Sequence, residues 1–381
     1  MSPNHNVLML ITGTFSIGGG VSAVNRLVLK ALSEWGSDGC NITVLNLHEP
    51  RGTGLDPFYA DEKRTTFKGF NGSTLLFTIE AWKCILSRRY DFIIADYPGV
   101  ASAILPLAVL GLCSYTVFCF GLELSPELLS WRRKLALCYA RKRLAISSTT
   151  CSQVLERFPD LTVDVCELAL DPKIACPPST TGRASIRMYA VSGLEKPLGS
   201  QVILCVGRMW SDQRHKGQDA LIAAMPEILK AFPAAQLVLA GSGDLLEELK
   251  NKATKYGVAD SVFLPGFVPD DLLSQLYEQC FVFAMPSKGE GFGLVYLEAM
   301  NWSKPCIGGK LDAAKDVIID GKTGILLDEP HNPPQIAGAV TYLLSRPDMA
   351  KQMGAAGLQR VKDTFLFTHF CDRFYNALNW E

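Results

Sequence analysis

The sequence lacks any strong excess of charge. Its 381 residues include 37 basic and 38 acidic side chains, which gives a formal net charge of −1. Proteins that bind nucleic acid normally carry a strongly basic domain, so this balance excludes DNA or RNA binding as the main task of the chain. The length also exceeds the usual size of a single hydrophobic core, and two domains are therefore expected.

Paired cysteines and metal-binding spacings are missing as well. The 12 cysteines stand singly, many of them within apolar runs as Cys119 and Cys205 do, and no CxxC pair occurs. Such cysteines behave as small core residues, whereas disulfide frameworks and zinc sites need regular spacing. No Asp-x-Asp pair is available to hold Mg²⁺ against a phosphate. We therefore expect reduced thiols, a cytoplasmic protein and a metal-independent site.

Long hydrophobic runs are scarce. Residues 100–122 carry no charged side chain and are long enough to span a bilayer. Pro106 and Gly111 interrupt this run, and residues 115–120 have the pattern of a separate strand, which favours a buried helix and a buried strand over a membrane span. The apolar run at 7–11 is too short for a signal-peptide core and follows no basic region, so no export is expected.

Short apolar runs alternate with segments of helical periodicity, for example residues 21–35, 218–231 and 245–256. This alternation predicts an α/β fold with parallel sheets covered by helices on both faces. Each half of the chain holds enough strands for its own doubly wound, Rossmann-like sheet, and residues 169–200, rich in Pro, Ser, Thr and Gly, have the composition of a linker. The predicted strands are residues 7–12, 42–47, 92–95, 115–120, 144–147, 202–206, 237–240, 262–265, 281–284 and 324–327.

Candidate functional residues follow the predicted strands of the second half. Ligands bind beyond the carboxyl ends of the strands in a doubly wound sheet. Arg208 follows one strand and Lys216 precedes the next helix, so the two cations can converge on a diphosphate. Glu290 lies in a glycine-rich loop before a helix that begins near Gly293, and Glu298 lies further along that helix, so the two carboxylates can bracket an elongated ligand. Ordinary surface cations and a solvated helix glutamate would explain the same pattern.

Together these segments resemble a known family. Arg208 and Lys216, then EGFGLVYLE, KPCIGG and DGKTGILLD in this order, resemble the C-terminal domain of retaining glycosyltransferase family four, which includes glycogen synthases and phosphatidylinositol mannosyltransferases. The opening segment GGGVSAVNRLVLKAL and the junction LAISSTT are similar to the same family. The resemblance implies the GT-B fold, in which two Rossmann-like domains face each other across a cleft.

The resemblance also implies domains and a reaction. Residues 1–185 would form an acceptor-binding domain, residues 186–365 a nucleotide-sugar-binding domain, and residues 366–381 a helix that crosses back to the first domain. The protein would move a sugar from a nucleoside-diphosphate sugar, a UDP- or GDP-sugar, to a saccharide or lipid-linked acceptor in polysaccharide biosynthesis. The anomeric configuration would be retained, and no separate cofactor would be needed.

By the same resemblance Arg208 and Lys216 would hold the donor diphosphate, Glu290 the transferred sugar and Glu298 the ribose. Three further groups would complete the donor site. Beside the nucleobase would lie Gly266, Phe267 and Val268. The amides beside the phosphate and sugar would be those of Gly291, Phe292, Gly293 and Leu294, and the glycines facing the diphosphate from the first domain would be Gly19 and Gly20.

The sequence departs from the family at two places. The family often has a histidine before the glycine that follows the fourth strand of its first domain, but here Phe120 precedes Gly121, so no general base is assigned. The segment WSDQRH between Arg208 and Lys216 is also long, and Arg214 or His215 could share the diphosphate contact. Residues 49–72, polar and glycine-bearing, are a candidate acceptor loop.

Two other classes of function are alternatives to a glycosyltransferase. A nicotinamide-dependent oxidoreductase is disfavoured because Gly18–Gly20 lacks GxGxxG spacing and because strand 42–47 runs into His48 without an acidic residue at its end. A catalytically silent sugar-binding or scaffold protein remains an alternative because of Phe120.

A basic segment suggests a membrane partner. No acidic side chain occurs between Glu127 and Glu156, and basic and apolar residues interleave there. Such a segment could rest on anionic lipid at the inner face of the cell membrane, although a helix that covers a sheet needs the same two faces. The six cations are Arg132, Arg133, Lys134, Arg141, Lys142 and Arg143.

Overall fold

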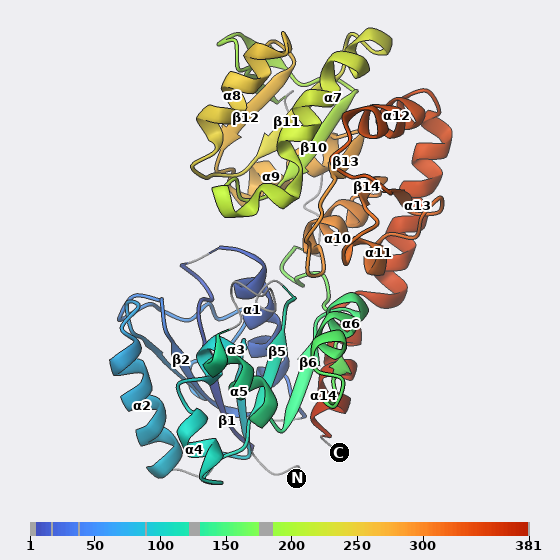
Figure 1. Cartoon of the computed structure of the whole chain (residues 1–381). Helices are drawn as coiled ribbons and strands as arrows, with labels where there is room; N and C mark the ends of the chain where they lie inside the picture. Colours follow the sequence, from blue (N-terminus) through green and yellow to red (C-terminus); the bar gives the residue numbers. More distant parts are fainter. Residues whose placement is uncertain are drawn as a thin grey trace. The chain divides into compact units, whose positions relative to one another are not determined.

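The computed structural model of the protein (Figure 1) describes residues 5–16, 18–36, 39–87, 90–121, 130–174 and 186–379. Residues 175–185 of the predicted linker lie outside this description. The chain divides into two compact units, the first made of Met1–Lys173 with Phe367–Glu381 and the second of Ile174–Leu366. Each unit has its own parallel sheet.

Within the described residues of the first unit, seven strands form one sheet in the order β3-β2-β1-β4-β5-β6-β7, and every neighbouring pair is parallel. β1 is central and almost fully buried, because its apolar side chains are covered on both faces. The strands are β1 (Asn6–Ile11), β2 (Asn41–Asn46), β3 (Thr65–Gly69), β4 (Phe92–Ala95), β5 (Thr116–Cys119), β6 (Lys142–Ala145) and β7 (Asp164–Val165). The helices are α1 (Gly20–Ser33), α2 (Thr74–Ser87), α3 (Pro98–Ala101), α4 (Leu105–Val109), α5 (Trp131–Tyr139), α6 (Ser148–Arg157) and α14 (Phe367–Leu378).

The last helix of the chain, α14, packs on the first unit. Its buried side chains, Phe370, Phe374 and Leu378, recur every four residues and form a single apolar stripe. The Phe374 ring stacks on Phe118 of β5 at 6.2 Å between centroids, and the Tyr375 hydroxyl donates to the carbonyl oxygen of Ala31 in α1 at 2.6 Å. The core of the first unit therefore includes side chains from the far end of the sequence.

In the second unit, six strands of its described part form a parallel sheet in the order β12-β11-β10-β13-β14-β15, and β8 pairs with β9 in a separate antiparallel hairpin. The strands are β8 (Arg187–Tyr189), β9 (Glu195–Pro197), β10 (Val202–Val206), β11 (Gln236–Ala240), β12 (Val262–Gly266), β13 (Val282–Met285), β14 (Cys306–Gly309) and β15 (Gly324–Leu327). The helices are the 3₁₀ helix η2 (Ser211–Lys216), α7 (Gln218–Ala231), α8 (Leu246–Lys255), α9 (Asp270–Gln279), α10 (Leu294–Asn301), α11 (Ala314–Val317), α12 (Pro333–Leu344) and α13 (Pro347–Thr364).

The predicted fold class, two doubly wound parallel-sheet units, is confirmed. Strands β3, β7, β8, β9 and β14 were not predicted, and β8 and β9 lie within the predicted linker. For β3 and β14 the composition explains the miss. β3 alternates buried and exposed residues at the sheet edge, and β14 ends in two glycines, which are rare in strands. A Cβ on Gly309 would lie 1.9 Å from the carbonyl oxygen of Ser287. Close packing of two backbones therefore removes the apolar signal from this strand.

Residues 100–122 do not form one long helix. Their described part contains the end of the short helix α3, then α4 with Pro106 in its first turn, and then strand β5. No helix found in the described ranges has both the length and the apolar character needed to cross a bilayer.

Candidate functional site

The candidate site lies at the carboxyl edge of the second sheet. β10 stands between β11 and β13, so the chain reverses its direction of travel across the sheet at this strand. In parallel sheets the loops on either side of such a switch point diverge and leave a crevice for a ligand. Arg208 follows β10 and is exposed, and the loops after β11, β12, β13 and β14 meet at the same edge.

Lys216 and Glu290 meet in this crevice. Lys216 ends η2, and Glu290 lies in the loop between β13 and α10. The Lys216 Nζ donates to Glu290 Oε2 at 2.9 Å, and the two side chains are 14% and 19% exposed. Two predicted residues 74 positions apart are thus brought together as a largely desolvated ion pair that a ligand can still reach.

The backbone around Glu290 is held by Asp312, a residue that the sequence pattern did not single out. Asp312 Oδ2 accepts the Glu290 N–H at 2.8 Å, and Oδ1 accepts the Ala314 N–H at 2.9 Å. The Ala313 N–H donates in turn to the Glu290 carbonyl oxygen at 3.1 Å. Burial raises the pKa of Asp312 to about 6. No sequence signal marked Asp312, because the strand before it, β14, was itself not predicted.

Helix α10 begins beside Glu290. Gly293 is its N-cap with a φ of 94°, and a Cβ there would lie 2.4 Å from the Tyr296 ring. Glycine is therefore required at this position. The free N–H groups of the first turn and the positive end of the helix dipole favour an anion. The Phe292 ring is buried and packs against Phe365 at 5.9 Å between centroids, so only the backbone of Phe292 can contribute to the site.

A buried tyrosine holds the Glu298 side chain through a hydrogen bond. Its Oε2 accepts the hydroxyl of Tyr277 in α9 at 2.7 Å. Burial raises the pKa of Tyr277 well above its ordinary value, and the Glu298 charge adds to that rise. Because a partner holds it, Glu298 is not an ordinary solvated helix residue.

The predicted residues after β12 differ in exposure. Gly266 ends the strand, Phe267 is 76% exposed, and Val268 is buried. Asp270 and Asp271 lie in the first turn of α9, after Pro269 at the cap position. There they favour the helix through its dipole rather than as caps.

Arg214 and His215 each have partners in the second unit. The Arg214 guanidinium forms two bonds with the Glu248 carboxylate of α8, at 2.8 and 2.5 Å. Burial lowers the pKa of His215, with a further contribution from the Lys216 charge. The His215 carbonyl oxygen accepts the Lys288 N–H at 2.8 Å, so His215 supports the loop that carries Glu290.

Comparison with known proteins shows which family the second unit matches. Residues 192–360 match the family described as glycosyl transferases group 1. The chain carries a glycosyl transferases group 1 domain. It is 35% identical over 227 residues to a GDP-mannose-dependent alpha-(1-6)-phosphatidylinositol monomannoside mannosyltransferase of Mycolicibacterium smegmatis, a match that covers 58% of this chain and 54% of the relative. It is 33% identical over 162 residues to a D-inositol 3-phosphate glycosyltransferase of Segniliparus rotundus, covering 42% of this chain and 35% of that one.

The match to these curated relatives therefore spans about half of their length or less. A solved structure extends the likeness of the fold to nearly the whole chain. Anabaena HepE, in complex with UDP and glucose, superposes with a TM-score of 0.75 at 17% identity, covering 99% of this chain and 100% of that chain. The fold is therefore that of the GT-B glycosyltransferases.

In the first unit, the loop between β1 and α1 also depends on a carboxylate. Oε1 of the buried Glu49 accepts the N–H groups of Thr14, Phe15 and Ser16 at 3.0, 2.7 and 2.8 Å. Burial alone would raise the pKa of Glu49, but the hydrogen bonds from this loop lower it below its ordinary value. An acidic residue does therefore lie beyond β2, one position past His48, and it is used by the loop.

Gly19 and Gly20 lie at the start of α1. Gly19 is the N-cap with a φ of 133°, and among the described residues no heavy atom outside the helix backbone and the chain neighbours lies within 4 Å of a Cβ built on Gly20. The loop before them is also tied to β4: Asp96 Oδ2 accepts the N–H and the hydroxyl of Thr12, both at 2.6 Å. Burial raises the pKa of Asp96 to about 6. The described residues before the predicted glycine-rich opening are thus held by hydrogen bonds to two carboxylates, those of Glu49 and Asp96.

Phe120 and Gly121 follow β5 as the sequence indicated, and residues 122–129 after them lie outside the description. Phe120 is half-buried. A phenyl ring cannot accept a proton, so Phe120 cannot take the place of a histidine base.

The prediction is wrong for Arg143, one of the six predicted lipid-facing cations, which is buried, and Lys142 is half-buried. Arg143 is 6% exposed, and its guanidinium donates to the carbonyl oxygens of Leu137 and Cys138 at 2.7 and 2.6 Å. Lys142 Nζ donates to the carbonyl of Ala377 and to Asn379 Oδ1 in and after α14. Both residues belong to strand β6, whose side chains are covered by neighbouring elements. The basic helix itself, α5, ends at Tyr139.

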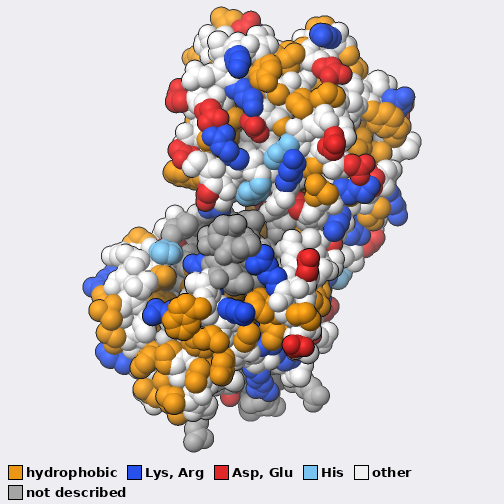
Figure 2. Space-filling model, in the orientation of Figure 1, with side chains coloured by type: hydrophobic (Ala, Val, Ile, Leu, Met, Phe, Trp, Pro, Cys, Tyr) orange, Lys and Arg blue, Asp and Glu red, His pale blue; other side chains and the backbone are white. Residues whose placement is uncertain are grey.

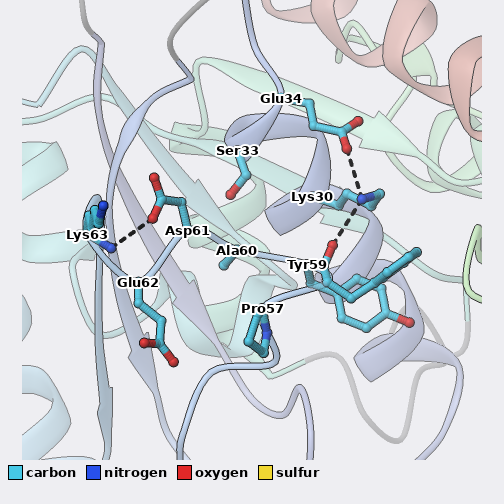
Figure 3. Close-up of a pocket in the computed structure, with 10 residues that line it drawn as sticks. Lys30, Ser33, Glu34, Pro57, Tyr59, Ala60, Asp61, Glu62 and Lys63 are labelled. Carbon is cyan, nitrogen blue, oxygen red and sulfur yellow. Dashed lines mark hydrogen bonds and ion pairs between the residues drawn. The ribbon is translucent and has the colours of Figure 1, made fainter.

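A pocket of about 540 Å³ lies elsewhere in the first unit (Figure 3). Lys30 lines this pocket, and its Nζ lies 2.8 Å from the Glu34 carboxylate and donates to the Phe58 carbonyl oxygen at 2.9 Å. The last turns of α1 and residues 57–63, which precede β3, form the lining. Both lead toward the amino ends of the strands, and the Tyr59 ring of the lining also contacts Phe15 of the loop between β1 and α1, at 6.2 Å between centroids.

Proposed function

We propose that the protein is a retaining glycosyltransferase that moves a sugar from a nucleoside-diphosphate sugar to a saccharide or lipid-linked acceptor. The Lys216–Glu290 pair at the start of α10, within the group 1 domain, carries this proposal. It places a cation, an acceptor of sugar hydroxyl hydrogen bonds and a helix N-terminus at one sheet edge. Retention of configuration is supported by the resemblance of the Glu290–Glu298 segment to family four.

Breaking the anomeric bond leaves negative charge on the departing diphosphate. Lys216, Arg208 and the N-terminus of α10 are the groups that would stabilise this charge, and donors placed in advance contribute most to such a step. Because two cations and a helix end supply the charge, we propose that no metal ion is needed. Activity that persists in a strong chelator supports this proposal, and loss of activity that Mg²⁺ restores contradicts it.

The carboxylates of Glu290 and Glu298 would bind different parts of the donor. Glu290 would accept hydrogen bonds from the transferred sugar, and Glu298, about two helical turns later at ~1.5 Å per residue, would accept those of the ribose. Gly266, Phe267 and Val268 would lie beside the nucleobase, with the exposed Phe267 ring available for stacking. The first unit would bind the acceptor and bring Gly19 and Gly20 to the diphosphate.

The donor base is best tested directly. Because the Mycolicibacterium relative is named as GDP-mannose-dependent and HepE was solved with UDP, GDP-mannose and UDP-glucose are the first donors to try. In a thermal-shift series with GDP, UDP and ADP, the correct base should raise Tm most, by mass action. Release of that diphosphate from its sugar then separates an enzyme from a silent sugar-binding protein. If no diphosphate raises Tm and no donor is turned over, the proposed function is wrong.

We also propose that the first unit contacts anionic lipid. Figure 2 shows apolar side chains gathered on this unit over α2, α4 and α5. α4 packs on α5, and Trp82 of α2 donates to the Ala103 carbonyl oxygen just before α4, so the three helices are neighbours. We name the exposed apolar side chains of α4, of the turn after it and of α5 the apolar patch: Val109, Leu110, Leu112, Trp131, Leu135 and Tyr139.

Cations lie beside the apolar patch. Arg132, Lys134 and Arg141 are exposed, which suits an anionic headgroup region, where each cation contributes up to ~1 kcal/mol. Co-sedimentation with vesicles that contain phosphatidylglycerol tests the proposal. Replacing these three cations by glutamine should abolish binding, while the charge-matched change of Lys230, Lys255 and Lys322 in the second unit should not. Parent protein that stays in solution at low salt contradicts the proposal.

A further inference from the structure

We infer that Asp312 is a positioning residue for Glu290: its carboxylate holds the backbone of the loop so that the Glu290 side chain meets Lys216 and the transferred sugar. The inference rests on the proposed donor site, and it adds a residue outside the Arg, Lys and paired-glutamate pattern from which that site was built.

The contacts tie two loops together. Asp312, 2% exposed, follows β14 and reaches the loop after β13, where Oδ2 accepts the Glu290 N–H at 2.8 Å. The Ala313 N–H returns a bond to the Glu290 carbonyl oxygen at 3.1 Å. Both backbone polar groups of Glu290 are thus fixed by two consecutive residues. The orientation of its side chain toward Lys216 Nζ follows from this anchorage.

Every hydrogen-bond partner of Asp312 is a donor. Besides the Glu290 N–H, these are the Ala314 N–H at 2.9 Å and the Ser287 hydroxyl. An ionised carboxylate accepts all of them, whereas an asparagine or a protonated acid must point a hydrogen at one donor. Loss of the charge therefore weakens the bonds from the two N–H groups, and it releases one of them unless the Ser287 hydroxyl turns to accept the new hydrogen. The bond to Glu290 is the one nearest the chemistry.

Asp312 is also placed to titrate. Burial raises its pKa to about 6, the Glu290 charge adds to the rise, and the bonds from Glu290, Ala314 and Ser287 oppose it. The other groups around it are Tyr296 of α10, whose hydroxyl donates to the Met285 carbonyl oxygen, and Lys216, which bonds Glu290. As pH falls through about 6, protonated Asp312 should loosen the Glu290 loop. The acid side of the pH–rate profile should therefore belong to a residue that does not touch the substrate.

Three variants test this role. Asp312→Asn removes the charge at nearly constant shape. Ser287→Ala removes one donor that lowers the Asp312 pKa. Asp320→Asn is the matched control, because Asp320 also accepts a backbone N–H, that of Leu326 at 2.9 Å, but is exposed and outside the site.

The readouts are the pH profile of donor turnover and the affinities for the nucleoside diphosphate and its sugar. Asp312→Asn should lower kcat/KM about 10- to 100-fold through misplacement of Glu290 and should flatten the acid limb near pH 6. It should also reduce the affinity advantage of the donor over the free diphosphate, while leaving diphosphate affinity within about twofold. Ser287→Ala should move the acid limb to higher pH, and Asp320→Asn should match the parent.

Two results would overturn the inference: an acid limb unchanged in both Asp312→Asn and Ser287→Ala, or an Asp312→Asn variant that loses diphosphate affinity as much as donor affinity. If Asp312→Asn does not fold, the shift expected for Ser287→Ala still decides. A parent that binds diphosphate but turns over no donor refutes the proposed function, and the donor–diphosphate affinity difference in the variants then decides the role of Asp312.

Discussion

The two units hold their functional loops in the same way but with different chemistry. In the first unit, Glu49 accepts three successive N–H groups, and its pKa lies below its ordinary value. In the second, Asp312 accepts N–H groups from two loops, and its pKa is raised to about 6. The balance between burial and donated hydrogen bonds thus decides the outcome. The first loop should stay pinned in mild acid, whereas the second should loosen.

The units differ also in how their cores are assembled. The second unit is one continuous stretch, whereas the first includes α14 from the end of the chain. Damage at the C-terminus should therefore appear in the unit that lies first in the sequence.

The largest effect is expected where Lys216 and Glu290 meet. Lys216→Ala or Glu290→Ala should lower kcat/KM by about 10²- to 10³-fold, the usual loss when one placed stabilising group is removed. Neither change opens a core cavity, but each leaves the other charge of a largely desolvated pair without its partner, so the fold should persist with a lowered Tm. Diphosphate release from the donor measures the effect, with Lys250→Ala as control because Lys250 pairs with Glu247 on the surface of the same unit. Parent-like turnover in either site variant would remove the basis of the proposed function.

Unfolding of the first unit alone is the next largest effect. Phe374→Ala removes a fully buried ring that stacks on Phe118, and such changes cost about 3 to 5 kcal/mol. Hydrogen exchange should show faster opening of β5 and α1, while β10 and β11 stay protected. Phe267→Ala, an exposed ring in the other unit, is the control. If the second unit opens first, α14 does not stabilise the first unit as described.

The sequence predicted the fold and the location of Lys216 and Glu290 at one sheet edge, although not their ion pair, because both predictions depend on strong regularities. Apolar runs of strand length mark buried parallel strands, and parallel strands bring their carboxyl ends to one edge. The roles of Asp312 and Glu49 could not be predicted from the sequence, because both carboxylates accept hydrogen bonds from distant backbone N–H groups. The separation is 22 positions for Asp312 and 33 to 35 positions for Glu49, and backbone groups do not appear in the composition. Arg143 was misassigned because a basic residue in a covered strand has the same pattern as one on an exposed helix.

A smaller loss of stability is expected from Glu49→Gln. Replacing charged by neutral hydrogen bonds to the loop at Thr14, Phe15 and Ser16 should cost about 2 kcal/mol at pH 7. Because the folded pKa is lowered, the contribution is present above the ordinary value of 4.5 and is lost as pH falls through the folded pKa. The gap between parent and variant should therefore close in acid. Denaturant unfolding from pH 7 to 3 measures this gap, with the exposed Glu62→Gln as control. A gap that widens in acid would contradict the account of Glu49.

The smallest effect distinguishes the two carboxylates of the second unit. If Glu298 binds the ribose, Glu298→Ala should weaken diphosphate affinity about tenfold, which is ~1.4 kcal/mol, and should change kcat little at saturating donor. Glu290→Ala should do the reverse, because the sugar and not the nucleotide meets Glu290. The change at Glu298 also strands the buried Tyr277 hydroxyl, whose bond to Glu298 measures 2.7 Å.

Tyr277→Phe separates these effects, because it removes the bond between the two side chains and leaves the carboxylate in place. Loss of stability without loss of diphosphate affinity in Tyr277→Phe, together with loss of affinity in Glu298→Ala, would assign the ribose contact to the Glu298 carboxylate itself. Equal loss of affinity in both variants would instead mean that the position of α10 on α9, and not the carboxylate, governs nucleotide binding.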